Sequence, residues 1–132
     1  MRITADTNIL VRAITGDDPE QGRIAERLLA DAELVAIPDV VLCELCWVLD
    51  RVYRFKAVEI ARTVRALANA DNVACNRSNV EAGLAMLEAG ADFADGVIAL
   101  AGQWLGGEML VSFDRKAVDH LGARGLKAIL PG

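Results

Sequence analysis

Five carboxylates of this 132-residue sequence stand where local folding rules do not demand them: Asp6, Glu44, Asp92, Asp95 and Asp114. Asp6 and Asp114 each follow a short apolar segment that is typical of a β-strand. If the two strands are parallel neighbours, both carboxylates emerge at the same edge of the sheet. Each also fits a structural role, because Asp is common in turns and at helix N-caps. Both interpretations stay open.

Glu44 is the only charged residue between Asp39 and Asp50, in a run of aliphatic residues, cysteines and a tryptophan. The length of this run predicts a buried helix. An unpaired buried carboxylate costs several kcal/mol unless it is protonated, ion-paired or bound to a metal. The alternative is that Glu44 lies on a narrow exposed stripe of the helix. We favour a functional site, because acids are so rarely buried.

Asp92 and Asp95 lie three residues apart at the start of a predicted helix and therefore share one face. Both positions suit an acid structurally, Asp92 as the N-cap and Asp95 in the first turn. The apolar stretch that follows, residues 96–101, is expected to be buried and to carry these acids toward the edge of the core. We therefore predict that Asp95 is functional, and that Asp92 is either a cap or an auxiliary ligand.

Converging acids would repel one another, raise their pKa values and lower stability, and a divalent cation removes that penalty. The ligands are all oxygen atoms, which suits Mg²⁺ or Mn²⁺, whereas zinc prefers His or Cys. The only histidine, His120, lies near the C-terminus. Two such ions can activate a water, hold a phosphate and stabilise a leaving oxygen. The chemistry indicated is hydrolysis of a phosphodiester.

The elements that must position these acids alternate between strand and helix. Strands are predicted at 2–5, 34–37, 72–75, 109–113 and 126–130, and helices at 7–14, 19–32, 39–49, 56–70, 78–90, 92–104 and 115–121. Asp18 and Pro19 are typical of a helix start, and Ser78 with Glu81 of a capping box. This order predicts an α/β fold with a central, mostly parallel sheet. No linker or repeat divides the chain, so we expect a single domain over residues 1–132.

Several apolar side chains are assigned to the interior by periodicity. These are Ile24, Leu28 and Leu29 in one helix, and Val58, Ala61, Val64 and Ala68 in another. Trp47 and Trp104 lie in apolar helices and are interpreted as core or interface residues. Cys43 and Cys46 lie inside an apolar run, with no second pair to complete a zinc site, so they are interpreted as buried core cysteines.

Composition excludes several classes of protein. With 54% hydrophobic residues the chain is not a disordered acidic tail, and it has no apolar run of the ~20 residues that a membrane helix requires. Asp6 interrupts the N-terminus before the core of a signal peptide could form, and three cysteines suit a reducing cytoplasm. The net charge of −5 argues against holding phosphate by bulk positive charge, but bound cations change the local sign.

The sequence resembles PIN-domain ribonucleases, and among them the VapC-type toxins of bacterial toxin–antitoxin pairs. Four pieces carry this resemblance in order: residues 5–8 (Ala-Asp-Thr-Asn), Glu44, residues 92–99 and residues 112–116. Each piece is weak alone, but their order and spacing are specific. The resemblance implies a PIN-like domain with a central, mostly parallel β-sheet flanked by α-helices.

The resemblance also implies a catalytic, metal-binding quartet of Asp6, Glu44, Asp95 and Asp114. Asp6 and Asp95 would bind Mg²⁺ directly, while Glu44 and Asp114 would complete the site and orient the attacking water. Only part of the family has an acid at Asp92, so its ligand role is open. Asn8 and Ser112 match polar positions that hold the acids by hydrogen bonds.

The activity implied is endonucleolytic cleavage of single-stranded RNA, leaving 5′-phosphate and 3′-hydroxyl ends. The implied partners are a cognate VapB-type antitoxin and a second copy of the chain, giving homodimers and toxin–antitoxin hetero-oligomers. Arg12, Arg115 and Lys116 are candidate phosphate contacts because they lie near site acids in sequence. Ordinary solvated surface charge accounts for them equally well.

Two other functions compete with this interpretation. A phosphoryl-transfer or receiver-type domain would use Asp6 as its nucleophile, but the segment Asp6-Thr7-Asn8 lacks the second acid that a haloacid-type phosphatase loop carries. A non-catalytic PIN-like interaction module is the other alternative. Degenerate modules lose acids, whereas this chain has every expected one.

Overall fold

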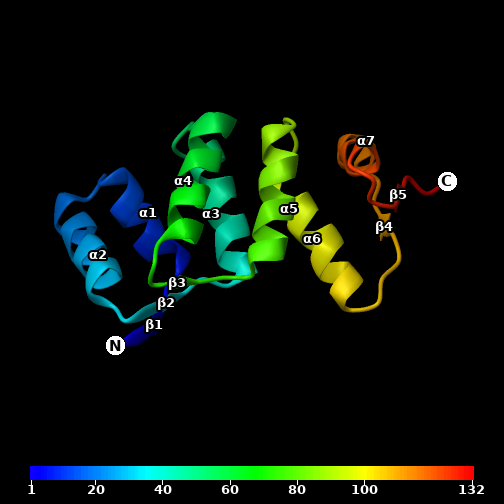
Figure 1. The fold of residues 1–132 in the computed structure, drawn as a ribbon. Helices are drawn as coiled ribbons and strands as arrows, with labels where there is room; N and C mark the ends of the chain where they lie inside the picture. Colours follow the sequence, from blue (N-terminus) through cyan, green and yellow to red (C-terminus); the bar gives the residue numbers. More distant parts are fainter. The chain divides into compact units, whose positions relative to one another are not determined.

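Short parallel strands alternate with helices along the chain, as the sequence predicts (Figure 1). The computed structural model describes residues 1–132, which fall into two compact units, Met1–Asn76 (the N-unit) and Arg77–Gly132 (the C-unit). Each is described by itself. No helix is both long and apolar enough to span a bilayer.

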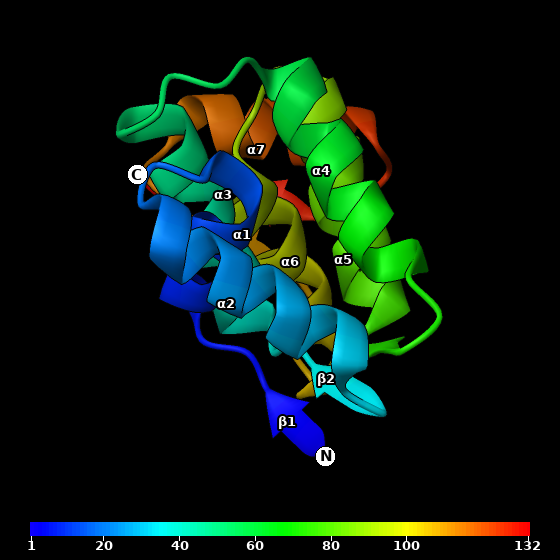
Figure 2. The same cartoon turned by 90° about the vertical axis from the view of Figure 1, so that its left-hand side faces the viewer.

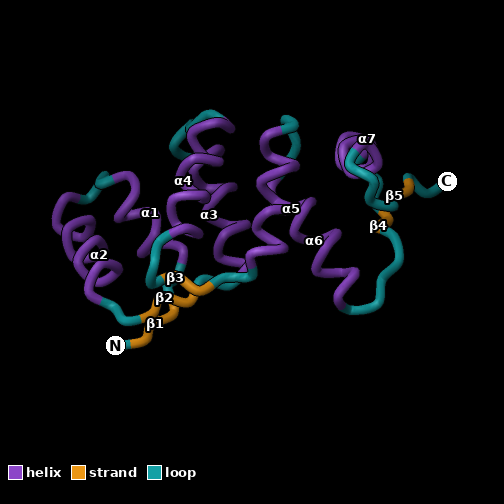
Figure 3. Tube along the Cα trace, viewed as in Figure 1, coloured by secondary structure: helices purple, strands orange, loops and turns teal.

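The N-unit is built on a sheet of three parallel strands in the order β1 (Arg2–Thr4), β2 (Leu34–Ala36) and β3 (Val73–Ala74). Figure 3 shows the three strands side by side. Val35 of the central strand is buried and lies opposite Ile3 on one side and Val73 on the other. The pairing continues past β1, since the Ala5 N–H donates to the Ala36 carbonyl at 3.0 Å. The sheet therefore fixes the chain up to the residue before Asp6.

Four helices complete the N-unit: α1 (Thr7–Thr15), α2 (Pro19–Asp31), α3 (Asp39–Arg51) and α4 (Ala57–Asn69). Helix α1 packs against both α2 and α3, and Figure 2 shows α1 and α2 side by side. Leu10, Leu45 and Leu49 are fully buried in this core. The predicted helix start at Asp18 is confirmed, because its carboxylate accepts a hydrogen bond from the Gln21 N–H at 3.1 Å.

The C-unit contains α5 (Arg77–Glu88), α6 (Phe93–Trp104), β4 (Leu110–Val111), α7 (Arg115–Ala123) and β5 (Ala128–Ile129). The strands β4 and β5 form a second parallel pair. A small core of Met86, Ala91, Ala99 and Leu121 joins the helices, with Leu110 and Ala128 of the two strands packed against it. This core packs β4 and β5 against α6 and α7.

Helices α5 and α6 approach closely because each has a glycine, which has no side chain, at their contact. A Cβ atom at Gly83 would lie 2.6 Å from the Phe93 ring, and one at Gly96 would overlap the backbone carbonyl of Ala82. The ring could shift, but the carbonyl of a packed helix cannot. The fixed contact at Gly96 matters because this residue directly follows Asp95.

We expect Gly96→Ala to destabilise the protein by about 1–3 kcal/mol, the usual cost of overpacking. Gly102→Ala in the same helix is the matched control, because a Cβ there meets nothing within 4 Å. Its better helix propensity should make Gly102→Ala neutral or stabilising, by up to about 1 kcal/mol. Thermal or urea unfolding of both variants checks the prediction, and equal effects would show that the close approach is not required.

The predicted α/β class with parallel strands flanked by helices is confirmed, although the strands are divided between two sheets. Several burial predictions are wrong. Side chains assigned to the interior expose 53–60% of their surface: Ile24, Val58 and Ile98. Trp47 and Trp104 expose 58% and 69%, which excludes the core alternative for them and leaves the interface alternative as a prediction. The reason is that each helix buries only a narrow stripe of its surface, which in α2 consists of Gly22 and Ala25.

Helix α3 and the start of α5 also differ from the prediction. Helix α3 buries one stripe, Leu42, Leu45, Cys46 and Leu49, rather than its whole surface. Helix α5 begins at Arg77, one residue before Ser78, so the predicted N-cap at Ser78 is wrong.

Candidate metal centre and acid-lined cavity

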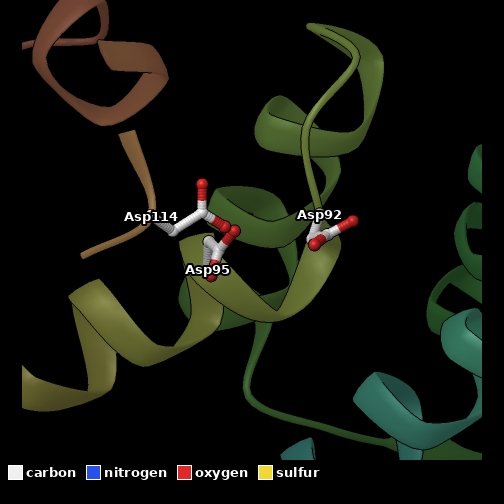
Figure 4. A group of neighbouring side chains, drawn as sticks. All are labelled: Asp92, Asp95 and Asp114. Carbon is white, nitrogen blue, oxygen red and sulfur yellow. The ribbon is translucent and has the colours of Figure 1, made fainter. Parts of the chain in front are cut away.

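Three carboxylates of the C-unit gather at one point. Asp92, Asp95 and Asp114 each offer a carboxylate oxygen, and these atoms all lie within 4.8 Å of one another. Figure 4 shows Asp95 on the first turn of α6, with its carboxylate and that of Asp114 pointing toward one another. We call these residues the aspartate cluster.

The local backbone explains how Asp114 reaches this point. It follows β4 and caps α7, where its carboxylate accepts a hydrogen bond from the Ala117 N–H at 3.1 Å. Its own N–H donates to the Ser112 hydroxyl oxygen at 3.0 Å. Ser112 therefore holds the loop that carries Asp114 through the backbone, rather than through the carboxylate.

Asp92 occupies the N-cap position of α6, yet its side chain makes no capping hydrogen bond. The backbone does bridge the two acids, because the Asp95 N–H donates to the Asp92 carbonyl at 3.1 Å. Asp92 therefore occupies the predicted N-cap position, but its side chain does not act as a cap. Its carboxylate lies within the aspartate cluster instead.

The electrostatics of the cluster favour a bound cation. Burial, together with the negative charges of Asp92 and Asp114, raises the pKa of the half-buried Asp95. No ion pair compensates any of the three acids. An all-oxygen donor set with uncompensated negative charge fits a hard divalent ion such as Mg²⁺ or Mn²⁺. These three residues are thus the ones that could hold it.

The raised pKa of Asp95 gives a pH-dependent prediction for the metal-free protein. Because the folded state binds this proton more tightly than the unfolded state, the ionised group costs stability above the raised pKa. Asp95→Asn should therefore raise the melting temperature at neutral pH. The gain should shrink as the pH falls through the raised pKa toward the ordinary value of 3.8. Paired melting curves in EDTA measure this difference, and a gain that grows on acidification would contradict burial and charge repulsion as the cause.

A second group of predicted site residues lies in the N-unit. Asp6 and Glu44 border one cavity of about 270 Å³, together with Asn8 and Arg12. Asp6 caps α1, where its carboxylate accepts a hydrogen bond from the Thr7 N–H at 2.8 Å. The cavity thus brings together acids that are 38 positions apart in the sequence.

Glu44 corrects one step of the sequence argument. Its side chain is exposed rather than buried, so burial of an unpaired carboxylate does not explain its presence. It occupies the polar stripe of α3, which was the alternative interpretation. This stripe nevertheless borders the cavity that contains Asp6.

Arg12 is held in place by its neighbours. Its Nε donates to Gln21 Oε1 at 2.8 Å, and its Nη1 forms an ion pair with Asp17 Oδ1 at 3.2 Å. The Tyr53 hydroxyl donates to the other oxygen of Asp17, at 2.5 Å. This hydrogen bond, helped by those to Thr15 and by the charge of Arg12, lowers the pKa of Asp17 against a smaller effect of desolvation.

Sequence reasoning missed Asp17 and Tyr53. Tyr53 is the only tyrosine of the chain, and it borders the same cavity as Asp6. No spacing rule connects positions 17 and 53, because only the tertiary fold brings them together.

Arg115 and Lys116 are exposed on the first turn of α7, directly after Asp114. Their contact with phosphate and the hydrogen bond from Asn8 to an acid stay predictions. The quartet of Asp6, Glu44, Asp95 and Asp114 also stays a prediction, because its members are divided between the two units.

The cysteines do not form a competing site. All three are free, and burial raises the pKa of the Cys43 thiol to about 11 and that of Cys46 to about 12. Such thiols stay protonated and weakly nucleophilic at neutral pH. Cys46 is buried as predicted, and Cys43 is half-buried.

Comparison with models of protein families shows which family the chain matches. A family model described as the PIN domain matches residues 3–122. The match begins before Asp6 and ends after Asp114, so it includes both groups of acids. No curated protein matches the sequence.

Proposed function

This chain belongs to the PIN domain family, and from that premise we propose that it is a metal-dependent endoribonuclease, the toxin of a toxin–antitoxin pair. PIN domains are generally nucleases and generally bind a divalent metal ion. The observation that carries the proposal is the aspartate cluster, whose three uncompensated carboxylates supply a ligand set for a hard cation.

In this proposal Asp92, Asp95 and Asp114 hold Mg²⁺ or Mn²⁺. The ion supplies Lewis-acid polarisation of the scissile phosphate and offsets its charge. Asp6 is a further metal ligand by resemblance. Glu44 is exposed and free to accept a proton from the attacking water. The water oxygen bonds to phosphorus as the bond to the 3′ oxygen breaks, and that oxygen takes a proton from solvent as it leaves. The products carry 5′-phosphate and 3′-hydroxyl ends.

The proposed substrate is RNA in single-stranded regions. Arg12, Arg115 and Lys116 are the proposed phosphate contacts, because they lie near site acids in sequence and the net charge of −5 does not favour RNA binding by bulk positive charge. Cleavage should then weaken as salt rises, because each neutralised phosphate releases counterions on binding.

The proposed partners are a VapB-type antitoxin, which would block the acids, and a second copy of the chain. We place the reaction in the cytoplasm, where three free cysteines would stay reduced. Induced expression should arrest growth, and co-expression of a small protein encoded upstream should relieve the arrest. Normal growth during induced expression would refute the toxin role but would not affect the nuclease proposal.

The nuclease proposal is tested by incubating the purified chain with end-labelled single-stranded RNA, in Mg²⁺ and in EDTA. The expected result is internal cleavage in Mg²⁺ alone, with 5′-phosphate ends that a 5′-phosphate-dependent exonuclease can degrade. The same RNA annealed to its complement is the matched control and should resist cleavage. Cleavage that persists in EDTA would refute metal dependence, and a chain inert in both Mg²⁺ and Mn²⁺ would favour a non-catalytic module.

A further inference from the structure

We propose that the cavity beside Asp6 and Glu44 receives one unstacked nucleobase of the RNA, and that Tyr53 is the residue on which this base packs. The inference rests on the proposed ribonuclease function and names the part of the substrate that the site selects. It concerns the N-unit alone, since every lining residue belongs to it.

The residues that line the cavity are of two chemical kinds. Polar and charged residues include Asp6, Asn8, Arg12 and Glu44. The others are three valines, Val11, Val48 and Val52, and the aromatic residue Tyr53. Val52 is 60% exposed, so the cavity includes an aliphatic surface that is open to solvent. Such a surface has no evident structural role, but it suits the uncharged face of a base.

The network around Asp17 prepares the cavity for a nucleotide. One carboxylate holds both the Tyr53 hydroxyl and the Arg12 guanidinium, while Gln21 holds Arg12 Nε. The aromatic ring and the cation are thus fixed before a substrate arrives, which lowers the entropy cost of binding. The Nη2 group of Arg12 is left to donate to a phosphate oxygen.

Charge decides which part of a nucleotide goes where. Asp6 and Glu44 repel a phosphate, so the phosphate is directed to Arg12 and the uncharged base to the Val48, Val52 and Tyr53 side. A cavity of about 270 Å³ lies just below the range of about 300–1,000 Å³ that is typical of drug-sized ligands, so it suits a single base. A base can enter only when it is unstacked, which would restrict cleavage to single strands.

The test couples Tyr53 to one base of the substrate. A cleavable RNA oligonucleotide is prepared with a single abasic site at each position around the scissile bond. With the wild-type protein, one abasic position should lower kcat/KM about tenfold, the usual effect of losing one base–aromatic contact. With Tyr53→Leu, the intact RNA should lose about tenfold, and the same abasic position should cost nothing further.

Two controls separate packing from other effects. Tyr53→Phe keeps the ring but loses the bond to Asp17, so it should retain sensitivity to that abasic position. Val52→Ala should weaken cleavage, whereas Val58→Ala, equally exposed at 60% but outside the cavity, should not. Melting curves of each variant confirm that it folds.

The outcomes also separate this inference from the proposed function. A wild-type chain that does not cleave the intact RNA would overturn the ribonuclease proposal itself. If the wild-type chain cleaves, but the losses in kcat/KM from Tyr53→Leu and from each abasic site simply multiply, the base-binding role of the cavity is refuted and the ribonuclease proposal stands.

Discussion

Asp6→Asn should reduce RNA cleavage by about 10³-fold while leaving the fold intact. The proposed role of Asp6 requires a carboxylate charge, and metal-assisted charge stabilisation contributes several kcal/mol to such a reaction, with about 1.4 kcal/mol for each factor of ten. An Asn side chain has nearly the same shape and accepts the same capping hydrogen bond from the Thr7 N–H. The free energy of unfolding should therefore change by less than about 0.5 kcal/mol. Initial cleavage rates and urea unfolding measure the two quantities.

Asp18→Asn is the matched control for this substitution. Asp18 also caps a helix, accepting a hydrogen bond from the Gln21 N–H, but it does not border the cavity. Its replacement should leave both cleavage and stability unchanged. If Asp6→Asn cleaves at the wild-type rate, Asp6 is only a helix cap, which was the structural alternative for this residue.

Asp95→Asn should give an equally large loss of cleavage, about 10³-fold, together with a gain in stability of the metal-free chain. The two effects have one cause. Asp95 is half-buried between two other negative charges, so its carboxylate costs folding energy that only a bound cation recovers. If Asp95 served packing instead, its replacement would lower the stability of the protein.

Asp119→Asn provides the comparison for Asp95. Asp119 is an exposed aspartate of α7 in the same unit and lies outside the aspartate cluster. Its neutralisation should change neither cleavage nor melting temperature. A fall in melting temperature for Asp95→Asn, with cleavage retained, would contradict the role of Asp95 as a metal ligand.

Much of the local structure could be predicted from the sequence, because turn chemistry is local. Asp18 followed by Pro19 predicted the start of α2, and Asp6 and Asp114 each fall at the junction of strand and helix where they were expected. The approach of Asp95 to Asp114 belongs to the expected convergence of acids, with Asp95 placed at the edge of the core by the apolar stretch that follows it.

Burial could not be predicted equally well, because it depends on which flank of a helix finds a partner. The periodicity of α2 marked Ile24 as interior, yet the buried residues of α2 are Gly22 and Ala25. The prediction that Glu44 is buried was wrong for the same reason. The pairing of Asp17 with Tyr53 could not be predicted for another reason, since both residues lie in connections between helices, where no periodicity indicates a partner.

The central claim is that the aspartate cluster binds a hard divalent cation, and Mn²⁺ titration of the metal-free protein, followed by electron paramagnetic resonance, tests it most directly. The wild-type chain is predicted to bind Mn²⁺ saturably, and Asp119→Asn to bind it equally well. Asp95→Asn is predicted to weaken that binding by at least about 10–100-fold, the loss typical even of a residue that only supports a metal ligand. Equal Mn²⁺ affinity in Asp95→Asn and the wild type would contradict the account.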